Sequence, residues 1–117
     1  MAHHALRGAL AAAAAALLAS CGSARRTDPL VGEQRPPNAQ LALGERVFDQ
    51  KCSQCHPGGE AGLGPALNNK PLPQWAVRIQ VRNGVGAMPR FASSEISHDE
   101  LSAVTAYMVW LRKRPHR

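Results

Sequence analysis

The sequence predicts a small all-α domain of three to four helices, and three observations support this fold class. Apolar residues recur at helical steps of three and four in residues 38–51, 74–82 and 98–113. No strand-like alternation of apolar and polar residues precedes Lys51. Aromatic residues make up only 4% of the 117 residues, so a core built from protein alone would be thin. Since domains this small generally need a stabilising metal or cofactor, we expect the helices to wrap around one.

Residues 1–20 resemble a bacterial signal peptide of the lipoprotein type. Arg7 precedes an Ala/Leu run of about a dozen residues, which is too short to span a bilayer. Leu18-Ala19-Ser20-Cys21 is similar to a lipobox, which implies that Cys21 is acylated and becomes the new amino terminus. An ordinary signal peptide with an incidental cysteine, or cleavage elsewhere, is the alternative. The expected location is the bacterial periplasm, with the lipid anchored in a membrane, and Gly22 favours the outer one.

Residues 21–37 are expected to form a flexible linker, because they are rich in Gly, Ser, Arg and Pro and lack apolar periodicity. The folded domain is expected at 38–117, and Asn38 is a suitable N-cap for its first helix. Gly44 and Phe48 share one face of that helix, where a glycine costs about 1 kcal/mol. The glycine therefore indicates that another helix crosses closely there, unless it is a tolerated defect.

A Cys-x-x-Cys-His motif, Cys52-Ser53-Gln54-Cys55-His56, follows the first helix. This spacing is typical of haem c attachment, with a thioether from each cysteine. His56 comes four residues after Cys52, one helical turn along the same face, where its imidazole can reach the haem iron axially. The alternatives are half of a zinc site and a thioredoxin-like dithiol. The first lacks a second ligand pair, since the other cysteine, Cys21, lies in the leader, and the second would follow a strand.

The glycine- and proline-rich stretch 57–67 predicts a loop of tight turns against a flat ligand. A ligating histidine usually donates its second ring proton to a backbone carbonyl, so we expect a carbonyl of this loop to accept it from His56. A short helix is predicted at 74–82, stopped by Asn83-Gly84. It carries Trp75, which is either a core residue or, through its indole N–H, a partner for a haem propionate.

Met88 is the predicted second axial ligand. It lies in an irregular segment that glycines precede and Pro89 follows, which is a poor place for a core methionine and a good one for a ligand. A thioether suits low-spin haem iron, and His/Met ligation raises the reduction potential. His98 and Met108 are alternative ligands, but each falls in a helical segment with another role.

The last helix is predicted from about His98 to about Lys113, because Ser97-His98-Asp99-Glu100 forms a capping box. Its expected buried stripe is Leu101, Val104, Met108 and Leu111, flanked by Tyr107 and Trp110, which can meet Gly44 and Phe48. The basic residues at its end suit the negative end of the helix dipole. A solvated helix end is the simpler interpretation of these cations, and docking or lipid-headgroup binding is the alternative.

The formal net charge of +6 does not indicate a nucleic-acid partner. Most of the cations lie in the leader, in the linker and at 112–117, so that the folded part is nearly balanced. A nucleic-acid-binding domain would instead interleave basic and aromatic residues on one face. Nucleic acid is therefore not an expected partner.

Together these elements resemble a small bacterial class I cytochrome c over residues 38–113. The similarity rests, in the family's order, on Gly44-x-x-x-Phe48, the Cys-x-x-Cys-His motif, Gly64-Pro65-Ala66-Leu67, Met88-Pro89 and the aromatic last helix. The resemblance implies that Cys52 and Cys55 bind one haem c covalently and that His56 and Met88 are its axial ligands. It also implies that Pro65 accepts the His56 proton through its carbonyl.

The resemblance implies electron transfer by a monomeric, membrane-tethered carrier whose iron cycles between Fe(III) and Fe(II). Its donor and acceptor are expected to be redox proteins such as a respiratory complex, an oxidase, a reductase or a dehydrogenase. The chain shows no acid/base pair or nucleophile, so we expect it not to be an enzyme. One alternative is a dedicated cytochrome subunit of a periplasmic dehydrogenase or reductase complex. Another is a ligand-binding or sensor haem protein with an open sixth position.

Overall fold

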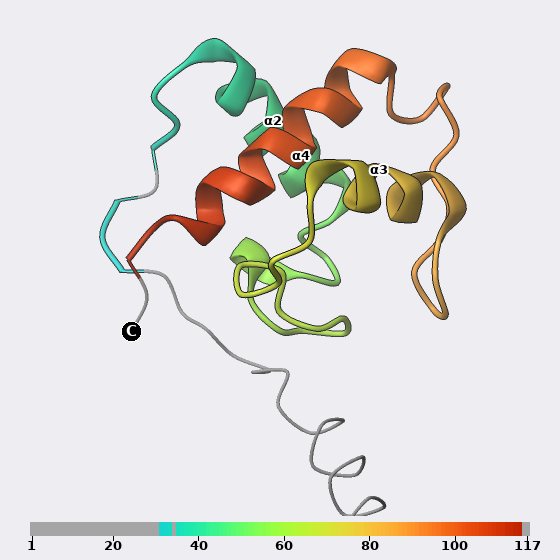
Figure 1. The fold of residues 1–117 in the computed structure, drawn as a ribbon, viewed down its shortest axis with the longest axis horizontal. Helices are drawn as coiled ribbons and strands as arrows, with labels where there is room; N and C mark the ends of the chain where they lie inside the picture. The colour runs from blue at the N-terminus through green and yellow to red at the C-terminus, as the bar shows by residue number, and fades with distance from the viewer. Residues whose placement is uncertain (1–30, 34, 116–117) are drawn as a thin grey trace, which may run out of the picture.

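The structure, a computed structural model, describes residues 31–33 and 35–115. The expected signal peptide at 1–20 and Cys21 lie outside the described residues. The described chain contains four elements in the order α2 (Ala39–Lys51), η1 (Pro57–Gly59), α3 (Gln74–Asn83) and α4 (His98–Arg112) (Figure 1). Over the same residues no strand forms, and only an isolated bridge links Val85 with Met88. The predicted all-α fold class is confirmed.

Helix α2 begins where the sequence predicts it and ends slightly earlier. The Asn38 side chain accepts a hydrogen bond from the Leu41 amide at 2.9 Å, as expected of an N-cap. The helix ends at Lys51, one residue before the cysteine motif, whereas the periodicity predicted that it would continue into it. The backbone nonetheless stays coiled, because the amides of Cys52 and Ser53 both donate to the Phe48 carbonyl at 2.8 and 2.9 Å.

Helices α2 and α4 cross in close contact at Gly44, as the glycine predicts (Figure 1). A Cβ added at Gly44 would lie 2.7 Å from the carbonyl carbon of Ala103 and 2.7 Å from the Cβ of Tyr107. Next to this contact, the rings of Phe48 and Tyr107 pack with their centroids 5.6 Å apart. Trp110 stacks on Tyr107 at 5.7 Å, so it supports this pair from the outer side. The crossing forms the centre of the core.

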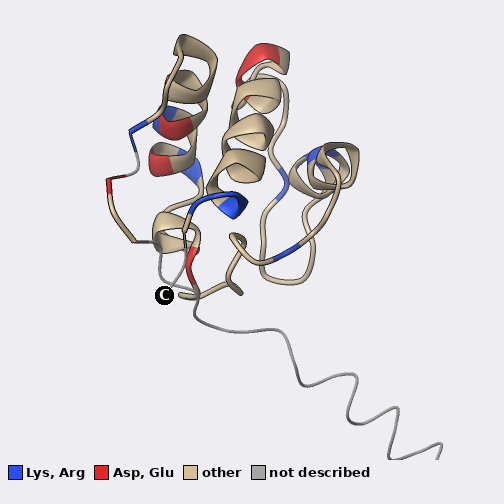
Figure 2. Cartoon of the chain, turned by 60° about the vertical axis from the view of Figure 1, so that its left-hand side comes forward, with Lys and Arg blue, Asp and Glu red and all other residues tan. Residues whose placement is uncertain are grey.

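Helix α4 begins with both hydrogen bonds of the predicted capping box. The Glu100 amide donates to Ser97 Oγ at 3.2 Å, and the Ser97 amide donates to Glu100 Oε2 at 2.7 Å. These bonds lower the pKa of the Glu100 carboxyl. Ile96 and Leu101, which flank the capping box and suit a hydrophobic staple, are both buried. Figure 2 shows acidic residues at the first turn of α4 and basic residues at its end, which matches the helix dipole.

Two arginines connect α4 to its surroundings. Arg78 on α3 donates to Ser102 Oγ at 3.1 Å, beside the buried α3 residues Val77 and Val81. Arg112 Nε donates to the Leu67 carbonyl at 3.2 Å and thereby attaches the loop that precedes α3. Burial lowers the pKa of Arg112. None of the helices in the described part of the chain is long and apolar enough to span a bilayer.

Candidate haem site

The two cysteines of the motif lie in a hydrogen-bonded turn directly after α2. The amides of Cys55 and His56 donate to the Cys52 carbonyl at 3.1 and 2.9 Å, so the backbone makes one turn between the cysteines and the histidine. Both thiols are free and half-buried, and Cys52 packs against the hydrophobic core. This arrangement brings the two sulfurs and the imidazole to one short segment of chain.

The electrostatics of Cys52 do not suit a redox dithiol. Burial, and then the neighbouring Cys55, raise the pKa of the Cys52 thiol to about 11. Thioredoxin-like dithiols depend on a lowered pKa, because the thiolate is the attacking species. Across residues 31–33 and 35–115, no three His, Cys, Asp or Glu side chains form a group that could hold a metal ion, as a structural zinc site requires. The raised pKa of Cys52 thus argues against the dithiol alternative.

His56 is buried and fixed in one tautomer. Its Nδ1 donates to the Pro65 carbonyl at 2.8 Å, because a carbonyl oxygen can only accept. In the neutral ring this bond leaves the lone pair on the other nitrogen, Nε2, where it can bind a metal. Gly64 lies directly against the ring, and a Cβ there would be 2.8 Å from Nδ1 and 2.9 Å from Nε2. The glycine is therefore required for the close approach of this loop to the imidazole.

Met88 lies at the end of a tight two-residue turn after α3. The Met88 amide donates to the Val85 carbonyl at 2.9 Å, and the Val85 amide donates to the Met88 carbonyl at 3.1 Å. Gly86, with φ of 56°, occupies the first central position, where a type II′ turn favours glycine. Gly84 has φ of 72°, and a Cβ there would lie 2.6 Å from the Met88 carbonyl oxygen. Met88 is half-buried and packs against the core.

Arg82 holds the Met88 loop, and the sequence pattern did not reveal it. Its Nη1 donates to the carbonyls of Phe91 and Ile96 at 3.1 and 2.7 Å. The Phe91 amide in turn donates to the Val81 carbonyl at 2.9 Å, so the segment after Met88 is also attached directly to α3. A cation in the last turn of a helix is a general signal for carbonyl binding, but it does not identify which carbonyls are bound.

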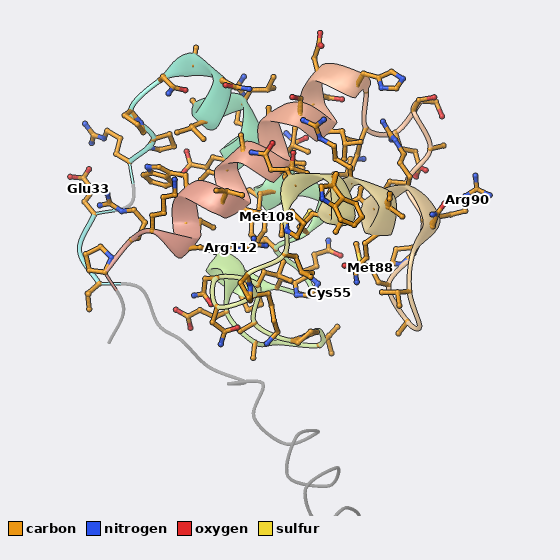
Figure 3. All side chains as sticks on the ribbon, viewed as in Figure 1. Glu33, Cys55, Met88, Arg90, Met108 and Arg112 are labelled. Atoms are coloured by element: carbon orange, nitrogen blue, oxygen red, sulfur yellow. The ribbon has the colours of Figure 1, made fainter. Side chains whose placement is uncertain are left out.

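Large apolar side chains are exposed on α3 and in the neighbouring loops. Trp75 and Ile79 are 65% and 54% exposed and stand one helical turn apart on α3. Trp75 is thus not part of the described core, which was one of its two expected roles. Figure 3 shows Cys55 and Met88 on the same side of α3. A flat apolar group attached at the cysteines would cover surface that is costly to leave in water.

Comparison with protein families identifies the fold and the motif together. The family model described as cytochrome c oxidase, cbb3-type, subunit III matches residues 39–108, which include α2, α3 and α4 as far as Met108. The chain belongs to the cytochrome c family. The cofactor that this family implies is covalently bound haem c. The free thiols of Cys52 and Cys55, the hydrogen bond that leaves His56 Nε2 for a metal, and the glycine contact at the imidazole fit such a group.

Individual cytochromes show the same similarity. The chain is 35% identical over 75 residues to the 4-cresol dehydrogenase [hydroxylating] cytochrome c subunit of Pseudomonas putida, covering 64% of this chain and 66% of that protein. It is 37% identical over 81 residues to cytochrome c6 of Tetradesmus obliquus, covering 61% of this chain and 90% of that protein. It is therefore a cytochrome c domain homologous to c6 cytochromes and to a cytochrome subunit of a dehydrogenase.

Two solved structures have the same fold. Cytochrome c6 of the diatom Phaeodactylum tricornutum superposes with a TM-score of 0.54 at 27% identity, covering 64% of this chain and 97% of that one. A chain of p-cresol methylhydroxylase with substrate bound superposes with a TM-score of 0.53 at 34% identity, covering 66% of this chain and 99% of that one. The expected small cytochrome c fold is confirmed.

Proposed function

We propose that this cytochrome carries single electrons through one haem c that Cys52 and Cys55 attach and that His56 and Met88 ligate. The haem iron supplies the one-electron couple between Fe(III) and Fe(II). The observation that carries the proposal is the hydrogen bond from His56 Nδ1 to Pro65, which leaves Nε2 for the metal. With both His56 and Met88 bound to it, the iron would have no coordination position left for a substrate. The chain then acts as an electron carrier and not as an enzyme.

The residues around the ligands support rapid electron transfer by keeping their positions fixed. The Pro65 carbonyl holds the His56 ring in one orientation. Gly84 allows the backbone of Met88 to pack directly against the end of α3. A ligand set that does not move when the charge changes keeps the reorganisation small. We expect Trp75 to contact the haem, with a propionate as the acceptor for its indole N–H.

The proposed location is the bacterial periplasm, with the protein anchored to a membrane by a lipid on Cys21. The support is the lipobox-like Leu18-Ala19-Ser20-Cys21 at the end of a short apolar run. Gly22 in the second mature position favours the outer membrane. The partners are a redox donor and a redox acceptor, which a monomeric carrier visits in turn. Metabolic labelling with a radioactive fatty acid, which Cys21→Ser should abolish, tests the anchor.

A second candidate function is that of a permanent subunit. The similarity to a dehydrogenase cytochrome subunit and to p-cresol methylhydroxylase favours it. A permanent subunit docks through a large apolar interface, whereas a free carrier binds weakly and with water at the interface. Purification from membranes in mild detergent separates the two. A stoichiometric dehydrogenase or reductase that stays bound in high salt supports the subunit, and a protein that elutes alone supports the carrier.

The absorption spectrum of the holo-protein tests the ligand set. We expect sharp low-spin bands on reduction and a far-red sulfur-to-iron band on oxidation, which Met88→Ala abolishes. Met108→Leu is the matched control, because Met108 is a buried core residue of α4 and its replacement should leave the band unchanged. A wild-type spectrum that is high-spin and shifts with carbon monoxide would contradict the proposal and favour the ligand-binding alternative. A protein without haem would contradict it entirely.

A further inference from the structure

The two ends of the described chain are hydrogen-bonded to each other. The Val31 amide donates to the Pro115 carbonyl at 3.0 Å, and Arg114 Nη2 donates to the Glu33 carbonyl at 3.0 Å. The Arg114 guanidinium also lies over the Trp110 ring, 5.0 Å from its centroid. Figure 1 shows the first described residues meeting the end of α4. Residues 31–33 of the expected linker are therefore held against the end of α4.

Basic residues lie at the end of α4 and next to residues 31–33. We call this end of the molecule the C-terminal pole and define it by Glu33, Arg35, Lys113 and Arg114. Arg35 Nη2 lies 2.9 Å from Glu33 Oε1, but both side chains are largely exposed, at 83% and 71%. An exposed ion pair contributes little to stability, so Arg35 can exchange Glu33 for a stronger anionic partner. Lys113 is exposed and precedes Arg114, whose guanidinium binds the Glu33 carbonyl.

The contact at Val31 shortens the distance to the proposed anchor. Only residues 22–30 lie between Cys21 and Val31. Nine residues of chain span about 15 to 18 Å on average, against about 20 to 24 Å for the sixteen of a linker that is free up to Pro37. Electrostatic attraction to a membrane acts over about 8 Å at physiological salt. Because the tether joins the domain at Val31, the C-terminal pole lies nearest the anchor along the chain and is the part of the domain best placed to come within this range.

We propose that the C-terminal pole binds the anionic headgroups of the membrane in which the protein is anchored, and so sets the orientation of the domain. The inference rests on the lipid anchor of the proposed function. Figure 3 shows Glu33 and Arg90 at opposite sides of the molecule, with Met88 toward the Arg90 side. Binding through the pole therefore leaves the haem-ligand side accessible to redox partners.

Amine footprinting of the acylated holo-protein tests the proposal. The protein is inserted into vesicles of phosphatidylcholine alone or with phosphatidylglycerol, and acetylation of Lys113 is compared with that of Lys51. Lys51 is exposed and lies near Glu100, at the opposite end of α4, so it serves as the internal reference. We expect the Lys113 to Lys51 ratio to fall at least fivefold on anionic vesicles, and to recover in high salt.

Two variants make the test specific. Arg35→Gln removes one cation of the pole and should weaken the protection of Lys113 about fivefold. Arg90→Gln removes the same charge on the other side of the molecule and should leave the protection unchanged. Equal Lys113 to Lys51 ratios on the two kinds of vesicle would overturn the proposal and leave the cations to a protein partner. Protection that Arg35→Gln and Arg90→Gln weaken equally would also overturn it.

Flotation on neutral vesicles reports the anchor separately. A protein that does not float with phosphatidylcholine carries no lipid. That result would contradict the proposed lipid on Cys21 but would not test headgroup binding by the C-terminal pole. The same protein is then mixed with anionic vesicles at low salt. Flotation that Arg35→Gln reduces and Arg90→Gln preserves would support the pole as a headgroup-binding surface. No flotation on anionic vesicles would overturn it.

Discussion

Replacing Gly44 by alanine tests whether the close approach of α2 and α4 determines the stability of the domain. The added Cβ would lie 2.7 Å from the carbonyl carbon of Ala103 and from the Cβ of Tyr107. Carbon atoms in ordinary contact are about 3.5 to 4.0 Å apart, so the helices must separate by about 1 Å. The obstructing atoms belong to the backbone and to a Cβ, and neither can rotate away.

The expected cost of Gly44→Ala follows from this separation. Overpacking of this kind costs about 1 to 3 kcal/mol. The Phe48–Tyr107 ring pair, at 5.6 Å, contributes about 0.5 to 1.5 kcal/mol and loosens with the crossing. The better helix propensity of alanine returns about 1 kcal/mol. We expect the free energy of unfolding to fall by about 1 to 3 kcal/mol, and Tm to fall by about 5 to 20 °C for a domain of this size.

Denaturant and thermal unfolding of the holo-protein, followed by far-UV circular dichroism, measure this loss. Position 50 is the control, because Gln50 is exposed on the same helix. The difference between Gln50→Gly and Gln50→Ala gives the helix propensity alone, without the crossing. If Gly44→Ala is as stable as the natural protein, or gains the amount seen at position 50, the crossing is not tightly constrained and the reasoning is refuted.

Three further predictions concern the site and its surroundings. Gly64→Ala should displace the His56 ring and lower the free energy of unfolding of the holo-protein by about 1 to 3 kcal/mol in denaturant titrations. Arg82→Gln should loosen the Met88 loop, so that the far-red sulfur-to-iron band disappears well below Tm in a temperature series. Burial raises the pKa of Tyr107 to about 12 from its usual 10, so stability should fall as the pH rises from 10 to 12. Tyr107→Phe should remove about 1 to 2 kcal/mol of this decline.

Each of these predictions has a control and a contradicting result. For Gly64→Ala the control is Leu63→Ala, whose exposed side chain should be neutral, and equal stability of the two variants would contradict the contact with His56. For Arg82 the control is Arg82→Lys, which keeps the charge but loses the several N–H donors of the guanidinium. A far-red band as stable in both variants as in the natural protein would show that the Met88 loop does not depend on Arg82. For Tyr107, the same stability slope above pH 10 in Tyr107→Phe would assign the decline to other groups.

The helix starts were predictable because their signals are local. Asn38 and the capping box at Ser97 act within three residues, and both hydrogen-bond patterns are present. The end of α2 was less predictable, because neither glycine nor proline marks it. The helix ends where the amides of Cys52 and Ser53 both donate to the Phe48 carbonyl. Backbone hydrogen bonds of this kind have no signature in the side-chain sequence. Apolar periodicity alone therefore overestimates this helix by running it into the cysteine motif.

The contacts that hold the site were not predictable from periodicity. Gly44 indicates that a helix crosses, but not that the backbone of Ala103 is what it meets. Arg82 binds carbonyls 9 and 14 residues away, and backbone carbonyls have no signature in the sequence. Trp75 shows the same limit: its apolar character fits the core, a cofactor or a partner, and the fold leaves it exposed on α3. Only the fold decides between such uses.

The two proposed axial ligands are held by interactions of different strength. His56 follows Cys55 directly, so haem attachment limits its movement, and the Pro65 carbonyl fixes its ring. Met88 is held by contacts with Gly84 and by the hydrogen bonds of Arg82, none of which is covalent. Local opening takes the segment with the fewest constraints first, so the Met88 segment would open before His56 moved. The electron-carrier and ligand-binding alternatives thus differ in the free energy needed to open the Met88 loop. The hydrogen bonds of Arg82 contribute to that free energy, and both alternatives use the same ligands.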